Sequence, residues 1–229
     1  MNDNQKPDFS LIIASAVHDM KNSLGMLLHS VDSMCDELPD AWRDKPNVAT
    51  VQYEAERVNS YLVQLLGLYR LQNKLLSLHI DEYYLEDLLD EQAAHYTQIF
   101  SINNIDLTIS VEKHLTWFFD REIIQGVLNN ALNNASRYTR SKITITAKIE
   151  GQYLLIEVHD DGAGYPETLL AAPPGEILND INFNTGSTSL GIYFAAMVTK
   201  LHTQKNLKGH VKLSNGGLLG GGVFSIYLP

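Results

Sequence analysis

The sequence predicts an α+β protein, in which an N-terminal helical hairpin precedes an α/β sandwich domain. Three observations carry this prediction. From Phe9 to about Leu78, apolar residues recur at alternating steps of three and four, which is typical of helices that pack through a heptad seam. After Leu78, short β-type runs alternate with helical runs, without the regular βαβ rhythm of a parallel sheet. Finally, 229 residues with 45% hydrophobic and 19% charged side chains suffice for two modest globular domains, which we expect at residues 1–78 and 79–229.

The predicted hairpin turns at residues 39–46, where a proline stands at each end of the sequence PDAWRDKP. Each arm carries a seam that is too apolar to face water, and two long helices bury little between themselves. We therefore expect two copies of the chain to pair into a four-helix bundle, which makes the protein a homodimer. The first seam consists of Val17, Met20, Leu24, Leu27, Val31, Met34 and Leu38, and the second of Val48, Val51, Ala55, Val58, Leu62, Leu65 and Tyr69.

The second domain is predicted to contain a connecting helix at residues 80–100, followed by strands and two further helices. The helices are expected at Glu122–Tyr138 and about Leu190–His202. The expected strands are Ile105–Val111, Leu115–Phe119, Lys142–Ile149, Tyr153–Val158, about Leu207–Leu213 and Val223–Leu228.

Composition excludes several classes of function. The formal net charge of −10 argues against nucleic acid as the main partner, because phosphate backbones are bound by basic surfaces. The single cysteine, Cys35, forms no internal disulfide, and no Cys/His cluster has zinc-ligand spacing. We find neither a signal peptide nor an apolar run near the roughly 20 residues that span a bilayer. The sequence therefore predicts a cytoplasmic protein that receives its input from a separate protein or from something soluble.

A histidine with polar neighbours lies inside the first predicted helix, in the string His18-Asp19-Met20-Lys21-Asn22. A neutral imidazole nitrogen is a good phosphoryl acceptor near pH 7. Asp19 can hold the proton on the other ring nitrogen and stabilise the positive ring that forms. Asn22 is one helical turn after His18 and shares its face. Alone this string is weak, since a helical histidine is more often a surface residue.

Three polar segments of the second domain form a possible nucleotide site. In the first, Asn130 and Asn134 share a helix face, with Arg137 one turn further on. Amide oxygens suit Mg²⁺ without repelling a triphosphate, and arginine binds phosphate oxygens. Each of the three segments also has a simpler explanation, as a polar helix, a turn or a helix cap.

The other two segments are rich in glycine. Asp160-Asp161-Gly162-Ala163-Gly164 directly follows a predicted strand, so that a carboxylate can accept a hydrogen bond from an adenine amino group while the glycines permit a tight turn. Gly186-Ser187-Thr188-Ser189-Leu190-Gly191 opens a predicted helix, where free backbone N–H groups suit phosphate. The order of the three segments, downstream of a hairpin with a histidine, makes coincidence improbable.

Together these motifs resemble those of the two-component sensor histidine kinases, whose ATP-binding domain has the Bergerat fold. His18 through Leu24 is similar to the H-box and Asn130 through Thr139 to the N-box, which Asp120 precedes. Asp160 through Gly164 is similar to the G1 box, and Gly186 through Gly191 to the G2 box. The resemblance covers nearly the whole chain. It implies a Bergerat-type ATP-binding domain after a dimerisation and phosphotransfer domain.

The resemblance also implies roles for individual residues. His18 would accept the phosphoryl group, Asp19 would act as its base or orienting partner, and Asn22 would support dephosphorylation of a partner regulator. ATP and Mg²⁺ would be the cofactors, with Asn134 as the metal ligand and a response-regulator receiver domain as the partner. The implied nucleotide-binding residues are Asn130, Asn134, Arg137, Tyr138, Asp160, Gly162, Gly164, Gly186, Thr188, Leu190 and Gly191.

The chain departs from the family pattern at several positions. Ser23 stands where a proline is common, Ser187 and Ser189 replace two glycines of the G2 box, and the predicted lid at residues 165–188 is short. Three alternatives therefore stay open: a phosphotransfer protein or regulator phosphatase with a weakened ATP site, a related ATPase or serine kinase, and a non-enzymatic scaffold.

Overall fold

The computed structural model describes residues 9–37, 46–171, 173–176 and 190–229. The chain divides into two compact units, Met1–Ser77 and Leu78–Pro229.

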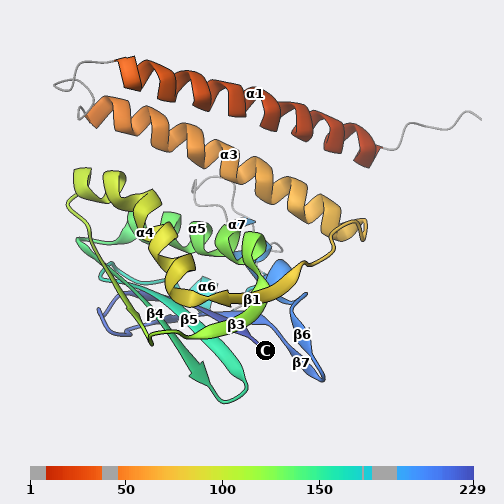
Figure 1. The fold of residues 1–229 in the computed structure, drawn as a ribbon, viewed down its shortest axis with the longest axis vertical. Coiled ribbons are helices and arrows are strands. Elements are labelled where there is room, and N and C mark those ends of the chain that lie inside the picture. The colour runs from red at the N-terminus through yellow and green to blue at the C-terminus, as the bar shows by residue number, and fades with distance from the viewer. Residues whose placement is uncertain (1–8, 38–45, 172, 177–189) are drawn as a thin grey trace, which may run out of the picture. The chain divides into compact units, whose positions relative to one another are not determined.

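The N-terminal unit contains two helices, α1 (Phe9–Glu37) and α3 (Pro46–Gln72), which run in opposite directions and pack against each other (Figure 1). The prediction that the helical region continues to about Leu78 is wrong, because α3 ends at Gln72. Lys74 adopts a left-handed backbone conformation with φ of 57°, and Leu75 N–H donates to the Arg70 carbonyl at 2.8 Å. These features close the last helical turn and redirect the chain.

The apolar seam of each helix is only partly covered within the hairpin. In α1, Leu24 and Val31 are half-buried, whereas Met20, Leu27 and Met34 are exposed, and these three residues lie at successive steps of seven. The same spacing recurs in α3, where Ala55 is buried and three other seam residues are exposed. These three residues are Val51, Val58 and Leu65. Each helix of this unit therefore presents a second apolar stripe that its partner helix does not cover.

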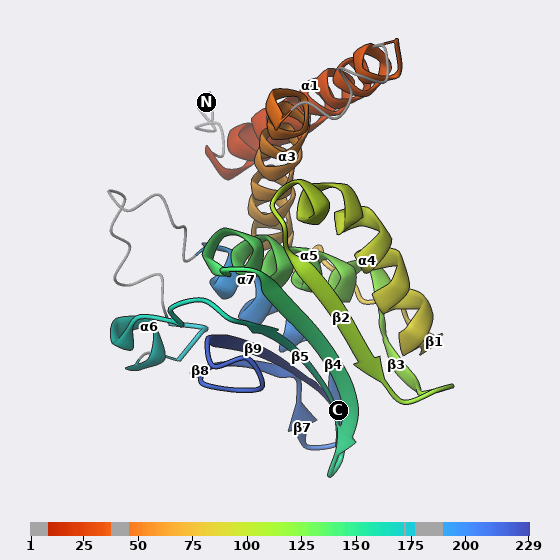
Figure 2. The ribbon, with the colours of Figure 1, turned by 90° about the vertical axis from the view of Figure 1, so that its left-hand side faces the viewer.

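The C-terminal unit is built on a five-stranded mixed sheet, confirming the predicted α+β class for this unit. The strand order is β2-β4-β5-β9-β8, and only the β2–β4 pair is parallel. Figure 2 shows α4, α5 and α7 lying on one face of this sheet. The strands are β2 (Asp106–Val111), β4 (Lys142–Glu150), β5 (Tyr153–Asp160), β8 (His210–Asn215) and β9 (Gly222–Leu228), and the helices are α4 (Leu85–Ile102), α5 (Arg121–Tyr138) and α7 (Leu190–Thr199).

A separate two-stranded ribbon replaces the first turn of the predicted connecting helix. We predicted helix over residues 80–100, but Ile80–Tyr84 forms β1, which pairs antiparallel with β3 (Thr116–Asp120). The partner strand lies more than 30 residues away in the sequence, so local periodicity cannot reveal the pairing. The helix itself, α4, begins at Leu85.

The predicted strand over Leu207–Leu213 is divided at Gly209 into β7 (Leu207–Lys208) and β8. Gly209 N–H donates to the His202 carbonyl at 2.7 Å, and a Cβ on Gly209 would lie 2.3 Å from the Thr199 carbonyl oxygen. This close approach to the end of α7 bends the chain. Two small elements complete the unit, α6 (Glu167–Ala171) and β6 (Thr203–Gln204), the latter paired with β7.

The core lies between the sheet and its helices. Strand β4 alternates, with Ile143, Ile145 and Ala147 buried and the two threonines between them half-buried, as expected for a strand with one covered face. The central strands β5 and β9 are buried along almost their whole length. Asp160 is thus the last residue of a strand that the core holds in place.

Asp120 joins three parts of this unit. One carboxylate oxygen caps α5 by accepting the Ile123 N–H at 3.1 Å, and the other accepts the His79 N–H at 2.7 Å. The Asp120 backbone N–H donates to Nε2 of buried His202 at 3.0 Å. This last bond requires a neutral imidazole with an unprotonated Nε2.

We predict that acidification destabilises the C-terminal unit through His202. Burial lowers the pKa of His202 below its ordinary value of 6.5, although Asp120 partly opposes the shift. The unfolded chain therefore takes up the proton first as the pH falls, so the stability that depends on neutral His202 is full above about pH 6.5 and is lost below it. Chemical denaturation between pH 7.5 and 5.5 should show a falling free energy of unfolding.

In the variant His202→Gln the free energy of unfolding should depend less steeply on pH, because glutamine does not titrate. The slope should fall by at most about 1.4 kcal/mol per pH unit. Exposed His114→Asn serves as the control, since asparagine tolerates the left-handed backbone there, with φ of 62°. An unchanged slope in His202→Gln would contradict the prediction.

Candidate functional site

Helix α5 presents the predicted asparagines on one face. Asn130 is 5% exposed and its Nδ2 has no hydrogen-bond partner, while Asn134, one turn later, is half-buried. Arg137 and Tyr138 end the helix and are exposed, with the guanidinium carbon 5.7 Å from the centre of the tyrosine ring. The helix thus runs from a buried amide to an exposed cation, an arrangement that can meet successive parts of a phosphate chain.

The start of α7 lies directly against this face of α5. A Cβ on Gly191 would lie only 2.2 Å from Oδ1 of Asn130, so the two helices approach too closely for any side chain there. Leu190, the first residue of α7, is half-buried. Two of the predicted nucleotide residues, Leu190 and Gly191, are therefore brought beside Asn130. The predicted residues Gly186 and Thr188 lie outside the described residues.

Asp160 ends β5 with its carboxylate held by backbone amides. Oδ1 accepts the N–H of Gly162 at 2.8 Å and that of Gly222 at 3.1 Å. Both bonds fix the orientation of this carboxylate, and Asp160 as a whole is only 7% exposed. Gly162 has no room for a side chain, because a Cβ there would lie 2.2 Å from the Tyr138 carbonyl oxygen. The strand end, the turn and the end of α5 therefore meet at one place.

Asp161 has a role that the sequence did not suggest. Its Oδ1 accepts the backbone N–H groups of Arg140 at 2.7 Å and Ser141 at 3.0 Å, together with the Thr139 hydroxyl. Burial alone would raise the pKa of Asp161, but these hydrogen bonds hold it well below its usual range. Asp161 thus ties the segment between α5 and β4 to the glycine turn. Its only sequence signal is its place beside Asp160.

The remaining predicted residues belong to the hairpin. His18, Asp19 and Asn22 lie in α1, where Asp19 and Asn22 are exposed, and the side chain of His18 is outside the described part of the structure. His18 and Asn22 are four residues apart in a continuous helix, which places them on the same helix face.

The C-terminal unit fits an adenine nucleotide with Mg²⁺ on chemical grounds. Asp160 supplies a fixed acceptor, and Asn130 and Asn134 supply neutral amide groups. Glycine positions 162, 221 and 222 leave the surroundings of Asp160 without side chains, since a Cβ on Gly221 or Gly222 would lie 2.5 or 2.7 Å from a carboxylate oxygen. Among the described residues, no group of three His, Cys, Asp or Glu side chains could hold a metal ion alone. A hard cation here would therefore depend on amide and phosphate oxygens.

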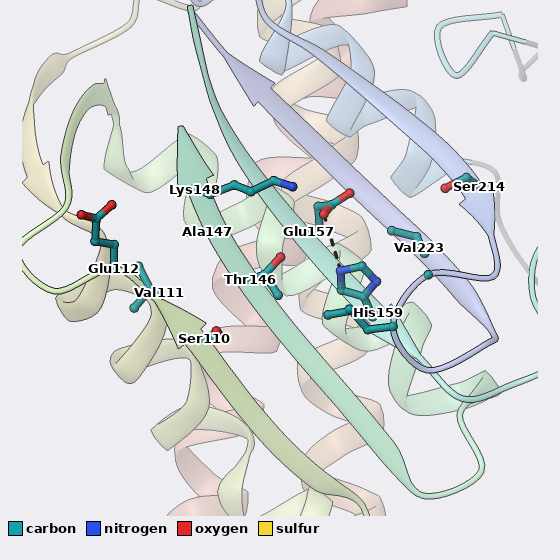
Figure 3. A pocket seen from close by; sticks show the side chains of 12 residues that line it. Ser110, Val111, Glu112, Thr146, Ala147, Lys148, Glu157, His159, Ser214 and Val223 are labelled. Atoms are coloured by element: carbon teal, nitrogen blue, oxygen red, sulfur yellow. Dashed lines mark ion pairs between the residues drawn. The ribbon is translucent and has the colours of Figure 1, made fainter. Parts of the chain in front are cut away.

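An open pocket of about 690 Å³ lies elsewhere, on the outward side chains of the sheet. Figure 3 shows His159 beside Glu157 in it, with His159 Nε2 3.6 Å from a Glu157 carboxylate oxygen. Burial lowers the pKa of His159, although Glu157 opposes the shift. None of the predicted nucleotide residues lines this pocket, because successive strand residues such as His159 and Asp160 point to opposite faces.

Comparison with known proteins identifies the C-terminal unit. Residues 119–229 match the family model described as histidine kinase-, DNA gyrase B- and HSP90-like ATPase. The sensor protein SrrB of Staphylococcus aureus strain N315 is 27% identical over 208 residues. The chain is similar to two-component sensor histidine kinases. The match spans 87% of this chain but only 35% of SrrB, so the chain corresponds to about a third of that sensor kinase.

Solved histidine kinase structures share the fold. The histidine kinase AdeS of Acinetobacter baumannii matches with a TM-score of 0.60 and 20% identity, covering 92% of this chain and 96% of AdeS. Full-length ShkA, in a complex with AMPPNP, matches with a TM-score of 0.65 and 21% identity, covering 94% of this chain and 45% of ShkA. The catalytic domain of ThkA has a TM-score of 0.56 and 24% identity, covering 66% of this chain and 96% of that domain. In the part of the chain that the structure describes, no helix is long and apolar enough to cross a membrane.

We predict that Gly162→Ala destabilises the C-terminal unit by about 1–3 kcal/mol, because the new methyl group would collide with a backbone carbonyl that cannot rotate away. Gly126→Ala is the matched control. Gly126 lies in α5 with nothing within 4 Å of its Cβ position, so alanine there should stabilise by about 0.5–1 kcal/mol. Urea denaturation measures both changes. Equal stabilities for the two variants would refute this account of the turn.

Proposed function

We propose that the chain is an ATP-dependent protein histidine kinase that phosphorylates its own His18 and passes the phosphoryl group to an aspartate of a separate response regulator. The observation that carries the proposal is the fixed carboxylate of Asp160, at a glycine turn that meets the end of the asparagine-bearing helix α5, in a domain that matches the histidine kinase-like ATPases. The relationship to sensor histidine kinases supports the assignment of the acceptor to the H-box-like string in α1.

The nucleotide would bind in the C-terminal unit. Asp160 accepts a hydrogen bond from the adenine amino group, and Arg137 meets phosphate oxygens while Tyr138 lines the pocket. Mg²⁺, when bound through Asn134 with Asn130 beside it, neutralises charge on the phosphates. The backbone of Gly191 leaves Asn130 in contact with α7, so that the helix start and the asparagine face act as one surface.

The transfer is an in-line displacement. A neutral ring nitrogen of His18 attacks the γ-phosphorus, and an N–P bond forms while the bond to the bridging oxygen breaks. ADP leaves with that bond's electron pair. Asp19 holds the proton on the other ring nitrogen and stabilises the imidazolium. In the second transfer the aspartate of the regulator takes the phosphoryl group from His18, and Asn22 is placed to support later dephosphorylation of the regulator.

The first test is labelling with γ-labelled ATP and Mg²⁺. We expect acid-labile label on the wild-type chain and none on His18→Gln, which lacks the acceptor, or on Asn134→Ala, which lacks the metal ligand. His29→Gln, an exposed histidine on the same helix, should be labelled like the wild type. An unlabelled wild type that still binds ATP would instead favour the phosphotransfer or phosphatase alternative, whose test is exchange with a phosphorylated receiver domain.

We also propose that the hairpin forms a homodimer. The exposed stripes that include Met20, Leu27 and Met34 in α1 and their counterparts in α3 support it, because stripes at steps of seven suit a four-helix bundle. Sedimentation equilibrium should give twice the chain mass of 25.6 kDa for the wild type. Leu27→Lys should shift the protein toward monomer, because burying the charge is costly, whereas exposed His29→Lys should not. A monomeric wild type would overturn the dimer.

A further inference from the structure

The segment that follows the glycine turn is held by a side chain from β8. Asn215, the last residue of β8, accepts the backbone N–H of Tyr165 at 2.7 Å and donates its own Nδ2–H to the Tyr165 carbonyl at 2.9 Å. The amide therefore pairs with both polar groups of one residue, as a neighbouring strand would. Two bonds from one planar group fix both the position and the orientation of that backbone.

Gly164 makes this pairing possible. It has φ of +81°, a conformation that side-chain-bearing residues rarely adopt, and a Cβ there would lie 2.6 Å from Oδ1 of Asn215. The backbone at Gly164 can therefore pass directly over the asparagine amide. We predicted Gly164 as a nucleotide-binding residue because it belongs to the G1-like string. In the structure its backbone lies against the side-chain amide of Asn215.

The Tyr165 ring then reaches the surroundings of Asp160. A Cβ on Gly222 would lie 3.1 Å from Cε2 of Tyr165 and 2.7 Å from Oδ2 of Asp160, so the ring and the carboxylate flank the same glycine. The pKa of the Tyr165 hydroxyl is well above its usual range, mainly because of burial and also because of Asp160. Gly222 itself donates to Oδ1 of Asp160.

Asn215 thus holds the Tyr165 backbone, and the Tyr165 ring lies beside Gly222, whose N–H donates to Asp160. We propose that Asn215 and Tyr165 are positioning residues that hold the Asp160 carboxylate in the orientation that selects adenine over guanine. The proposal rests on the proposed function and deepens it. Adenine presents an amino donor where guanine presents a carbonyl acceptor, so a fixed carboxylate favours the first and repels the second. A carboxylate that can rotate away from the base neither attracts the adenine amino group nor repels the guanine carbonyl.

The test compares the affinities of ATP and GTP for the wild-type chain and its variants by isothermal titration calorimetry with Mg²⁺. Asn215→Ala removes both hydrogen bonds and should weaken ATP binding by about tenfold, the effect of losing hydrogen bonds of ordinary strength. The preference for ATP over GTP should fall by a similar factor, because GTP gains less from the fixed carboxylate. A purely structural role would lower stability without changing this preference.

Three further variants keep the proposal falsifiable. Asn215→Asp retains the acceptor for Tyr165 N–H but loses the donor, so its ATP affinity should lie between those of wild type and Asn215→Ala. Tyr165→Phe keeps the ring beside Gly222 and should preserve the preference for ATP over GTP. Tyr165→Ala removes the ring and should reduce that preference. Exposed Asn206→Ala, in the turn between β6 and β7, is the matched control.

The outcomes separate the two proposals. If the wild type binds ATP and Asn215→Ala has the same affinities as the wild type, this inference is overturned and the proposed function stands. If the wild type binds no ATP, both fall. Thermal melting shows whether each variant is folded, and an unfolded Asn215→Ala leaves the decision to Asn215→Asp and the two Tyr165 variants.

Discussion

The hydrogen bonds of one buried carboxylate, Asp120, hold the C-terminal unit together where its layers meet. The Asp120 side chain caps α5 and holds the chain before β1, and the backbone N–H of the same residue donates to a neutral imidazole, His202, after α7. The position of α5 determines where its asparagine face lies, and α7 packs on that face with no room for a side chain at Gly191. The candidate site therefore depends on contacts that are remote from any nucleotide.

Two neighbouring carboxylates at the end of β5, those of Asp160 and Asp161, make different contacts. Asp160 is oriented by two backbone amides, and neighbouring Asp161 joins the glycine turn to the segment after α5. Asp160 ends β5 and Asp161 begins the turn that follows it, so the two carboxylates have different hydrogen-bond partners. This arrangement explains why two aspartates stand together before the first glycine. Both rely on glycines that admit close backbone contacts.

The sequence predicted those parts of the molecule that local patterns encode. The helix with Asn130 and Asn134, the strand that ends at Asp160 and most other elements were visible from periodicity and glycine placement. The ribbon of β1 was missed, because Ile80–Tyr84 owes its conformation to pairing with β3. Gly209 divided a predicted strand for a similar reason, since its contact lies at the end of α7. The contributions of Asp161 and Asn215 could not be predicted either, because their partners are distant in the sequence.

His159 and Asp160 stand next to each other in β5 but face opposite sides of the sheet, and one turn touches both. Gly217 lies against the His159 ring, and the Gly221 N–H donates to the Asp160 carbonyl at 3.1 Å. A compound bound in the pocket of Figure 3 would therefore contact β5, the strand that carries Asp160, without occupying the proposed nucleotide site. Because the two sites are separate, such a compound would not compete with a nucleotide bound at the proposed site.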